Sequence, residues 1–537
     1  MCMTCGERLV QLLEGHGVEL VFGIPGVHTV ELYRGLPATR IRHITPRHEQ
    51  GAGFMADGYA RVSGKPGVCF IITGPGMTNI MTALAQAAGD SIPMLVISSV
   101  NRTEQLGLGG GRLHELPSQR ALTAEVTAFS HTLLRPDELP AVLARAFAVF
   151  SGARPRPVHI EIPIDVITAN ADHLLAARGT PPHRPGPNPL DLERAAAALG
   201  AARRPVLLLG GGCIDAGAEA TALAERLDAP AACTINAKGV LPKGHPLSLG
   251  SNATFPAVRE LIAQADVVLA VGTELGETDY DLFNDNGLKF SGRLIRIDID
   301  PEQLERNFPA DIAIVSDARL ALSALLNALG KAPSRAGAGE GAGLAERART
   351  QLRKEWPSAW RPQLRALEVV QNTLPEVIIV GDSTQPVYSG NHGYEARRAR
   401  SWFNSATGYG TLGYGLPAAI GAKLAAPERP VVALIGDGGL QFTLAELGSA
   451  VEAKAPIIVL LWNNQGYGEI KRYMQGRGIP TIGVDIHTPD FLALARAFGC
   501  RAQRARSFEE LHTHLRSAER LDSPMLIEVL EEGEFLG

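Results

Sequence analysis

Short apolar runs alternate with longer segments of mixed polarity along the whole chain. Runs of this kind, rich in Val, Ile and Leu, are typical of strands that are buried on both faces of a parallel sheet. The segments between them have the composition of helices, so the alternation predicts doubly wound α/β folds with parallel sheets. The predicted strands are 20–22, 68–73, 94–98, 158–162, 206–209, 267–271, 294–299, 377–380, 431–435 and 457–462.

Two breaks in composition divide this pattern into three parts. Residues 179–187 are rich in Pro and predict a stiff, extended linker, whereas residues 331–344 are rich in Gly and Ala and predict a flexible one. The parts between the breaks have the size of single domains. We therefore expect three domains, at 1–175, 188–330 and 360–537, and we treat the first and the third as candidates for duplicated halves.

Composition narrows the class of protein. The chain has 537 residues, 45% of them hydrophobic and 20% charged, with a net charge of −5, which gives no reason to expect a nucleic acid or a membrane as partner. No apolar stretch reaches the length of a membrane span, and the N-terminus lacks the plan of a signal peptide. We expect a cytoplasmic enzyme. Six Cys residues in a chain of this length do not indicate a disulfide framework.

Polar clusters follow two of the predicted strands near the C-terminal end. Gly436-Asp437-Gly438 closes the run at 431–435, and Asn463-Asn464 closes the run at 457–462. Either cluster alone is an ordinary turn. Together they place an Asp carboxylate and an Asn carbonyl at the carboxyl ends of neighbouring strands, where open α/β sheets bind ligands. These oxygens suit Mg²⁺, and glycine lets backbone N–H groups approach phosphate, so the pair predicts a site for a divalent metal and a diphosphate.

The residue types and the spacing of the two clusters resemble the thiamine-diphosphate motif of the 2-oxo acid decarboxylase and acetolactate synthase superfamily. The resemblance implies that Asp437, Asn464 and the carbonyl of Gly466 hold Mg²⁺. It implies further contacts to thiamine diphosphate from residues on the same edge of the sheet and from the turn after the strand at 377–380. These are Gly436, Gly438, Gly439, Tyr467, Thr384 and Gln385.

The first third of the chain resembles the pyrimidine-binding domain of the same superfamily, through segments 23–26, 73–79 and 156–163. The resemblance implies that Glu49 activates the cofactor by a hydrogen bond to its pyrimidine ring, although a Glu at a helix start also suits the helix dipole. Gly26, Thr73 and Asn79 are the implied cofactor contacts of this domain. Segment 402–419 resembles the part that bends the cofactor, with Gly410 presenting its carbonyl and Leu412 as the wedge.

The resemblance also implies an assembly. In the superfamily, the pyrimidine domain of one subunit faces the diphosphate domain of another, so we expect at least a homodimer and, in keeping with many relatives, a homotetramer. Glu49 and Asp437 of one cofactor site would then come from different chains.

Two reactions share the first steps, namely simple decarboxylation of a 2-oxo acid and carboligation by an acetolactate synthase-like enzyme. The segments around 249–254 and 271–278 lack the patterns typical of synthases that carry FAD, so we do not expect FAD. The Gly210-Gly211-Gly212 run does not complete a dinucleotide motif, because Asp215 stands where the third glycine belongs. We favour decarboxylation and keep carboligation as the alternative.

Three residues are candidates for contact with the 2-oxo acid substrate. Glu469 stands where relatives usually carry an apolar side chain, and a carboxylate there would pair with a guanidinium. Its alternative role is to stabilise the first turn of a helix. His28 and His114 are candidates for the rim of the site, against the alternative of packed or solvated imidazoles. The chain most resembles decarboxylases of 5-guanidino-2-oxopentanoate, which yield 4-guanidinobutanal and CO₂.

Overall fold

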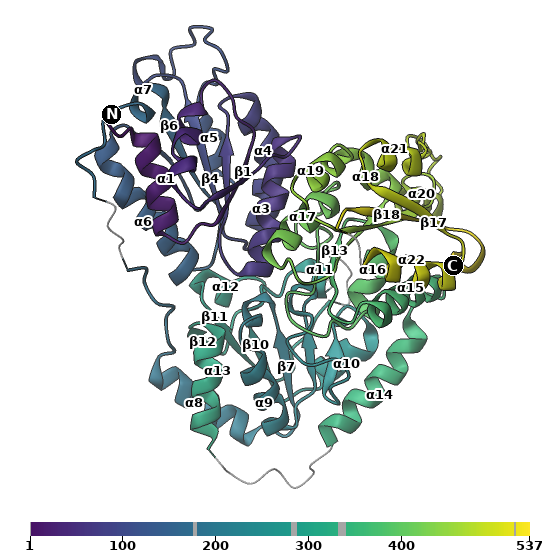
Figure 1. Cartoon of the computed structure of the whole chain (residues 1–537). Helices are drawn as coiled ribbons and strands as arrows, with labels where there is room; N and C mark the ends of the chain where they lie inside the picture. Colours follow the sequence, from purple (N-terminus) through teal and green to yellow (C-terminus); the bar gives the residue numbers. More distant parts are fainter. Residues whose placement is uncertain (1, 176–179, 281–286, 331–339, 520–521, 537) are drawn as a thin grey trace. The chain divides into compact units, whose positions relative to one another are not determined.

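The computed structural model describes residues 2–175, 180–280, 287–330, 340–519 and 522–536 (Figure 1). It divides into two compact units, each considered by itself. The first unit comprises Met1–Pro182, Thr373–Thr384 and Asn404–Glu534, and the second comprises His183–Asn372, Gln385–Phe403 and Phe535–Gly537.

The described residues form three six-stranded parallel sheets, which confirms the predicted fold class. The first sheet has the order β2-β1-β3-β4-β6-β5, the second β12-β11-β10-β7-β8-β9, and the third β14-β13-β15-β16-β18-β17. Each sheet lies within one of the predicted domain ranges, whose boundaries stay a prediction. The strands are β1 (Leu20–Gly23), β2 (Arg42–Ile44), β3 (Gly67–Ile71), β4 (Met94–Val100), β5 (Phe129–Thr132), β6 (Val158–Pro163), β7 (Pro205–Leu209), β8 (Ala231–Cys233), β9 (Ser248–Gly250), β10 (Val267–Val271), β11 (Arg293–Asp298), β12 (Ile312–Val315), β13 (Ile378–Gly381), β14 (Trp402–Asn404), β15 (Val431–Gly436), β16 (Ile458–Asn463), β17 (Arg501–Ala505) and β18 (Met525–Leu530).

The first and third sheets have the same topology. When the strands of each sheet are numbered in chain order, both sheets read 2-1-3-4-6-5. The second sheet reads 6-5-4-1-2-3, which is the order of dinucleotide-binding folds seen from its other edge. The shared order supports the suggestion that the first and third domains are duplicated halves.

The helices that cover these sheets carry some of the predicted site residues, and most of the others lie in loops. They are α1 (Cys5–Gly15), α2 (Val30–Arg34), α3 (Glu49–Ser63), α4 (Pro75–Gly89), α5 (Gln119–Ala124), α6 (Leu139–Gly152), α7 (Ile164–Ile167), α8 (Pro189–Ala201), α9 (Gly217–Leu227), α10 (Pro256–Ala263), α11 (Glu277–Tyr280), α12 (Pro301–Glu305), α13 (Ala318–Leu329), α14 (Glu340–Glu355), α15 (Trp360–Thr373), α16 (Gln385–Gly393), α17 (Gly415–Ala425), α18 (Asp437–Thr443), α19 (Glu446–Glu452), α20 (Gly468–Gly476), α21 (Phe491–Ala497) and α22 (Phe508–Ala518).

Helices α3 and α17 join the two halves of the first unit and lie side by side in Figure 1. Glycine permits this close crossing. A Cβ at Gly58 would overlap the carbonyl oxygen of Ala418, and a Cβ at Gly421 would overlap the carbonyl oxygen of Met55. The small residues that the sequence places along α3 therefore let its backbone touch the backbone of α17.

In the second unit, the glycine run after β7 serves packing between loops. A Cβ at Gly210 would overlap the carbonyl oxygen of Gly272, and a Cβ at Gly212 would lie 2.8 Å from the Cα of Gly272. The glycines thus allow the loops after β7 and β10 to touch, which gives them a structural reason that needs no nucleotide.

The structure departs from the sequence-based expectations at two places. The segment from Leu444 to Glu452 has helix-forming residues, and α19 covers most of it, but the helix α18, which begins at Asp437 directly after β15, was not expected. The predicted flexible linker at 331–344 is wrong for residues 340–344, because α14 begins at Glu340. The rest of the linker, 331–339, lies outside the described residues.

Candidate active site

The carboxyl end of β15 turns directly into α18, which places Asp437 in the first turn of that helix. Asp437 is 1% exposed, and its Oδ1 accepts a hydrogen bond from the backbone N–H of Asn464 at 3.3 Å. Its Oδ2 is buried with no hydrogen-bond partner among the described residues. Burial raises the pKa of this carboxyl group. A buried acceptor without a donor is costly, so this oxygen fits a site completed by a cation.

The side-chain amide of Asn464 and the carbonyl of Gly466 lie next to this carboxylate. One terminal atom of the Asn464 side-chain amide lies 2.9 Å from the carbonyl oxygen of Gly466 and 3.1 Å from Oδ1 of Asp437. As nitrogen, this atom donates to both oxygens; as oxygen, it forms with them a cluster of three acceptors that only a cation can hold together. The side chain of the neighbouring Asn463 is used elsewhere, because its Oδ1 accepts from the backbone N–H of Gln465 at 3.0 Å and its Nδ2 donates to Glu528 at 2.8 Å.

The predicted diphosphate contacts of the first unit lie around the same turn. A Cβ at Gly438 would lie 2.7 Å from the Tyr467 ring, and a Cβ at Gly436 would lie 2.9 Å from Oγ1 of Thr384. A Cβ at Gly439 would lie 3.0 Å from Oδ1 of the buried Asp382. A larger side chain at these glycines would press on Tyr467, Thr384 or Asp382, so glycine lets the turn pack closely against them. The structure therefore brings together the predicted metal ligands, Thr384, Tyr467 and the three glycines.

Gln385 belongs to the second unit and begins α16. Its side chain is 4% exposed, and neither its Oε1 nor its Nε2 has a hydrogen-bond partner among the described residues. A buried amide that lacks partners on both atoms is rare, since each lost hydrogen bond costs about 1–3 kcal/mol. The side chain is thus suited to a polar ligand, as predicted from its position after a strand.

Glu49 begins α3, preceded by His48 as the N-cap residue. The carboxylate is buried, and its Oε2 accepts a hydrogen bond from Nδ2 of Asn79 at 2.9 Å. Its Oε1 lies 3.3 Å from the ideal Cβ position of Gly76, so glycine keeps the space beside this oxygen open. The structure therefore joins two predicted site residues, Glu49 and Asn79, and fixes one carboxylate oxygen while leaving room at the other.

Glu446 holds the start of α3 and was not predicted from the sequence. It is buried in the first turn of α19, and its carboxylate accepts hydrogen bonds from the backbone N–H groups of Arg47 and His48 at 3.0 and 3.1 Å. Ser449 donates to the same carboxylate at 2.6 Å. The only signal in the sequence was an acidic residue inside a predicted helix, and that does not distinguish it from a solvated carboxylate.

The imidazoles of His28 and His114 face each other in the first unit. Their ring centroids are 5.3 Å apart with an edge-to-face geometry, and Nδ1 of each ring is buried without a hydrogen-bond partner among the described residues. Burial, and secondarily His114, lowers the pKa of His28. His114 has a φ of +59°, a strained value for a side chain of this size, and its backbone packs against Gly74. Two candidates chosen separately from the sequence thus form one pair.

Thr73 lies at the end of β3, but its hydroxyl group is used inside the domain. It donates to Oε1 of Gln119 at 2.8 Å, and the backbone N–H of Gly74 donates to the same oxygen at 3.1 Å. Gln119, which was not singled out from the sequence, donates in turn to Ser98 at 2.9 Å. A contact from Thr73 to the cofactor would therefore come from its backbone or methyl group. Gly26 packs tightly on Ile72, which a Cβ at this position would overlap.

Gly410 and Leu412 lie in the loop before α17. Gly410 is exposed, with a φ of +75°, and Leu412 is half-buried. Asp382, which was not assigned a separate role, anchors the end of this loop: its carboxylate accepts from the backbone N–H of Gly415 at 2.9 Å and of Gly413 at 3.3 Å. Burial raises the pKa of Asp382 to about 6.

Glu469 lies in the first turn of α20 and is exposed. No hydrogen bond or ion pair of its carboxylate occurs within the described part of the chain. Two other side chains of α20 do form ion pairs: Lys471 contacts Asp485 at 2.6 Å, and Arg472 contacts Glu531 at 3.6 Å. Glu469 is therefore free to meet a ligand, and its position also suits the helix dipole, so the two roles expected from the sequence both persist.

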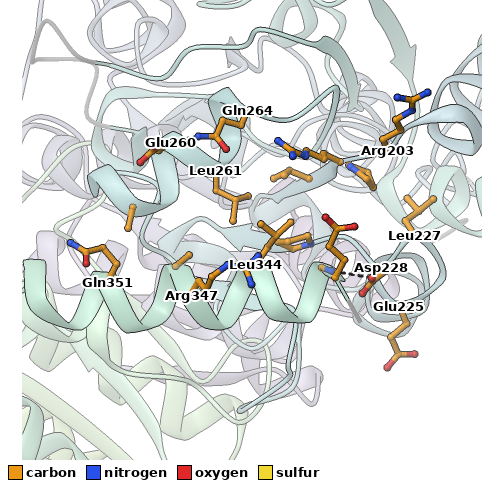
Figure 2. Close-up of a pocket in the computed structure, with 18 of the residues that line it drawn as sticks. Arg203, Glu225, Leu227, Asp228, Glu260, Leu261, Gln264, Leu344, Arg347 and Gln351 are labelled. Carbon is orange, nitrogen blue, oxygen red and sulfur yellow. Dashed lines mark hydrogen bonds between the residues drawn. The ribbon is translucent and has the colours of Figure 1, made fainter. Parts of the chain in front are cut away.

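A cavity of about 510 Å³ in the second unit contains none of the predicted site residues (Figure 2). Leu344, Arg347 and Gln351 of α14 line one side of it, opposite Leu261 and Gln264. Its arginines, at positions 203, 204, 226 and 347, are balanced by acidic residues at 225, 228, 260 and 340. Within the described ranges, no cluster of three or more His, Cys, Asp or Glu side chains could hold a metal ion. The predicted metal site differs in kind, since only one of its donors is a carboxylate.

Comparison with known proteins agrees with this arrangement. Three family profiles match: "Thiamine pyrophosphate enzyme, N-terminal TPP binding domain" over residues 3–126, the central domain of the same enzymes over 192–325, and their C-terminal TPP binding domain over 382–529. Thiamine pyrophosphate is another name for thiamine diphosphate. No helix in the described part of the chain is long and apolar enough to cross a membrane.

Full-length relatives match as well. The chain is 49% identical to a probable 2-ketoarginine decarboxylase of Pseudomonas aeruginosa, over 98% of this chain and 94% of the relative. It is 33% identical to the large subunit of acetolactate synthase isozyme 1 of Escherichia coli, over 99% of this chain and 94% of the relative. It is also 33% identical to an acetolactate synthase large subunit of Corynebacterium glutamicum, over 98% and 87%. The chain therefore belongs to the family of thiamine pyrophosphate enzymes.

Proposed function

We propose that the chain is a thiamine-diphosphate- and Mg²⁺-dependent decarboxylase that converts 5-guanidino-2-oxopentanoate, or 2-ketoarginine, into 4-guanidinobutanal and CO₂. The main support is the 49% identity, over nearly the whole of both chains, to a probable 2-ketoarginine decarboxylase. The acetolactate synthases match over a similar length at 33%. Carboligation therefore remains the second candidate, and FAD is not part of the proposal.

The metal would be held by the carboxylate of Asp437, the side-chain oxygen of Asn464 and the carbonyl of Gly466. Two features support this donor set: the approach of the Asn464 side-chain amide to the Gly466 carbonyl and to Oδ1 of Asp437 at 2.9 and 3.1 Å, and the buried, unpartnered Oδ2 of Asp437. All three are hard oxygen donors, and Mg²⁺ keeps its other positions for water and phosphate oxygens. The backbone N–H groups of Gly438 and Gly439, which carry no side chain, could approach a diphosphate closely.

Glu49 would hold and orient the ring of the cofactor. When bound, thiamine diphosphate supplies a carbon nucleophile, and its ring takes up the electron pair that remains when CO₂ leaves. Glu49 would bond to a ring nitrogen through Oε1, the oxygen that faces the space kept by Gly76, while Asn79 fixes Oε2. A carboxylate held on one side in this way presents its other oxygen in a fixed direction, which is what a proton transfer requires.

The pair formed by His28 and His114 would handle the proton that replaces CO₂ on the substrate carbon. Neutral imidazole carries one proton and one lone pair, and each Nδ1 of the pair is buried without a partner. Burial lowers the pKa of His28 and so favours its neutral form at physiological pH. Protonation of that carbon yields an aldehyde, whereas capture by a second 2-oxo acid yields a longer product. A proton donor at this place therefore favours release of the aldehyde over carboligation.

One separation within the chain supports an assembly in which two chains share each cofactor site. Within one chain, Glu49 contacts Asn79 in the first turn of α4, whereas Thr411 of the cofactor-bending loop donates its backbone N–H to Gln86 at 3.4 Å. Residues 79 and 86 are about 10 Å apart along a helix. The loop of a second chain would bring Gly410 and Leu412 to Glu49. We propose a homodimer as the minimal unit and a homotetramer as the complete one; a cytoplasmic location stays a prediction.

The test of the substrate is the variant Glu469→Gln. It keeps the size of the side chain and removes its charge, so kcat/KM for 5-guanidino-2-oxopentanoate should fall about 10- to 100-fold, the equivalent of about 1.5–3 kcal/mol for a charged hydrogen bond. The kcat/KM for an uncharged 2-oxo acid of similar length should change less than about twofold. Equal losses on both substrates would reject contact between Glu469 and the guanidinium group.

A further inference from the structure

The loop that carries Gly410 and Leu412 has an unusually free backbone in its middle and fixed ends. We define residues 407–414 as the wedge segment. Gly408, Gly410 and Gly413 have φ values of +63°, +75° and +79°, and residues 408–410 are exposed, whereas Thr407 and Tyr414 are buried. Glycine has the largest backbone entropy of any residue, so such a segment keeps one conformation only if other groups hold it.

The C-terminal end of α4 holds the start of the wedge segment. The hydroxyl group of Thr407 lies 3.1 and 3.2 Å from the two carboxylate oxygens of Asp90, to which it donates. Gln86, one turn earlier, donates to Asp90 at 2.8 Å and accepts from the backbone N–H of Thr411 at 3.4 Å. These contacts reach from the N-terminal half of the first unit to the loop of its C-terminal half.

A buried guanidinium group joins these contacts to the far end of the segment. Arg61 of α3 is 7% exposed and forms ion pairs of 2.6 Å with Asp57 and with Asp90. The hydroxyl group of Tyr414 donates to Asp57, which is fully buried. The chain Thr407–Asp90–Arg61–Asp57–Tyr414 therefore closes a ring that ties both ends of the wedge segment to α3 and α4.

Stability alone is a weak reason for this ring. Removing charged groups from water costs several kcal/mol for each ion, and a buried ion pair is often no more stable than apolar residues of the same volume. What an ion pair with additional hydrogen bonds adds is direction, since an Arg guanidinium with two carboxylates has a fixed planar geometry. The ring is thus better suited to positioning than to strengthening the fold.

We propose that the buried Asp57–Arg61–Asp90 network, through Thr407 and Tyr414, positions the wedge segment so that the Gly410 carbonyl and the Leu412 side chain meet the cofactor in its reactive, bent form. This inference rests on the proposed function. Asp57, Arg61, Asp90, Thr407 and Tyr414 are positioning residues in it, since they act through Gly410 and Leu412. Asp382 holds the same segment from the C-terminal domain and is a separate anchor.

The experiment replaces the hydroxyl group that links the segment to Asp90. Thr407→Val keeps the shape of the side chain and removes the hydrogen bond, and Thr407→Ser restores it. The matched control is Thr373→Val. Thr373 of α15 is also buried, and its hydroxyl group forms a hydrogen bond with His512 of α22 at 2.8 Å. Three quantities are measured for each protein with Mg²⁺: the Kd of thiamine diphosphate, the unfolding temperature, and the rate at which the C2 proton of the bound cofactor exchanges with D₂O.

Thr407→Val should lower the exchange rate about tenfold, equivalent to about 1.4 kcal/mol, while its Kd stays within about threefold of wild type. Thr407→Ser should restore most of the rate. Thr373→Val should lose a similar amount of stability and keep the wild-type rate. An unchanged exchange rate in Thr407→Val, or equal losses in the Val and Ser variants, would overturn the inference.

Exchange is measured without substrate, so the test is separate from the choice of substrate. If wild-type protein binds the cofactor and accelerates exchange but does not convert 5-guanidino-2-oxopentanoate, the proposed substrate is wrong and the comparison of Thr407 variants still decides the role of the network. If wild-type protein does not bind thiamine diphosphate, the proposed function and this inference are both overturned.

Discussion

At the scale of single residues, the site is built from oxygen atoms whose partners are incomplete. Oδ2 of Asp437 lacks a donor, and the amides of Asn464 and Gln385 face acceptors or nothing at all within the described chain. Among the described residues, buried polar atoms without a hydrogen-bond partner also occur outside this site, as at Tyr33, Asn252 and Trp356, whereas those around Gln119 are paired in a network. In the proposed function, a metal and a diphosphate would supply the partners that Asp437 and Asn464 lack.

Asp382 gives a prediction for pH dependence. Its pKa is about 6 in the folded protein, against an ordinary value of 3.8, because of burial. The folded state thus binds this proton more tightly than the unfolded chain, so its stabilising effect is complete below about pH 4 and is lost as the pH rises through about 6. Between pH 7.5 and pH 5, the free energy of unfolding of wild type should gain about 1 kcal/mol relative to Asp382→Asn.

Urea unfolding of both proteins at the two pH values measures this difference. Gly476→Ala is the control, since it carries no titratable change and its difference from wild type should not vary with pH. If the stability of wild type relative to Asp382→Asn stays constant or decreases as the pH falls, Asp382 does not carry a raised pKa.

The ligand residues were accessible from the sequence because they follow strands directly. Asp437 and Asn464 directly follow β15 and β16. Neighbouring parallel strands end at the same edge of the sheet, so these two residues come together wherever the two strands pair. The roles of Glu446 and Asp382 were not accessible in the same way. Each accepts hydrogen bonds from backbone groups far away in the sequence, and no local pattern of residues encodes such a partner.

At the scale of elements, the interior strands other than β8 and β18 were predicted to within two residues because they are continuous apolar runs. Strands at the sheet edges were not predicted. β2, with the sequence Arg-His-Ile, and β17, with two Arg and a Gln in five residues, are exposed on one side and carry no apolar run. Strand β18 is interior but contains the buried Glu528, which pairs with Asn463 and Arg504 and interrupts the pattern.

The crossing of α3 and α17 can be tested through one of its glycines. In Gly58→Ala the new methyl group would overlap the backbone carbonyl of Ala418, which cannot move without shifting α17. We expect a loss of about 2 kcal/mol in the free energy of unfolding. Because α3 begins with Glu49, the variant should also lose activity.

Chemical unfolding measures the first effect. Gly476→Ala is the matched control, since Gly476 is helical and has open space where its Cβ would stand. Alanine there should be neutral or stabilise by up to about 1 kcal/mol. Similar effects of the two substitutions would mean that the contact of α3 with α17 is not as close as described.

At the scale of the whole molecule, the shared topology of the first and third sheets suits a cofactor held at its two ends by two related domains. The proposed exchange between subunits has a direct consequence. Glu49→Gln and Asp437→Asn should each bind or use the cofactor poorly and have little activity as pure proteins. If each site takes Glu49 from one chain and Asp437 from the other, a dimer of the two variants contains one intact site.

Equal mixing of the two variants, with refolding to exchange the chains, should then restore about a quarter of wild-type activity, since half the dimers are mixed and each has one of two sites intact. Each variant refolded alone is the control. No recovery in the mixture, with mixed dimers verified by differently tagged chains, would place both residues of a site in the same chain.

The most direct test of the account is to reconstitute the cofactor-free protein and analyse its product. Purified protein, stripped of cofactor with a chelator, is given 5-guanidino-2-oxopentanoate with thiamine diphosphate and Mg²⁺ together, and with each omitted. The account predicts that CO₂ and 4-guanidinobutanal form in equal amounts only when both are present. Product formation without them, a carboligation product from pyruvate with no aldehyde from 5-guanidino-2-oxopentanoate, or no release of CO₂ would contradict it.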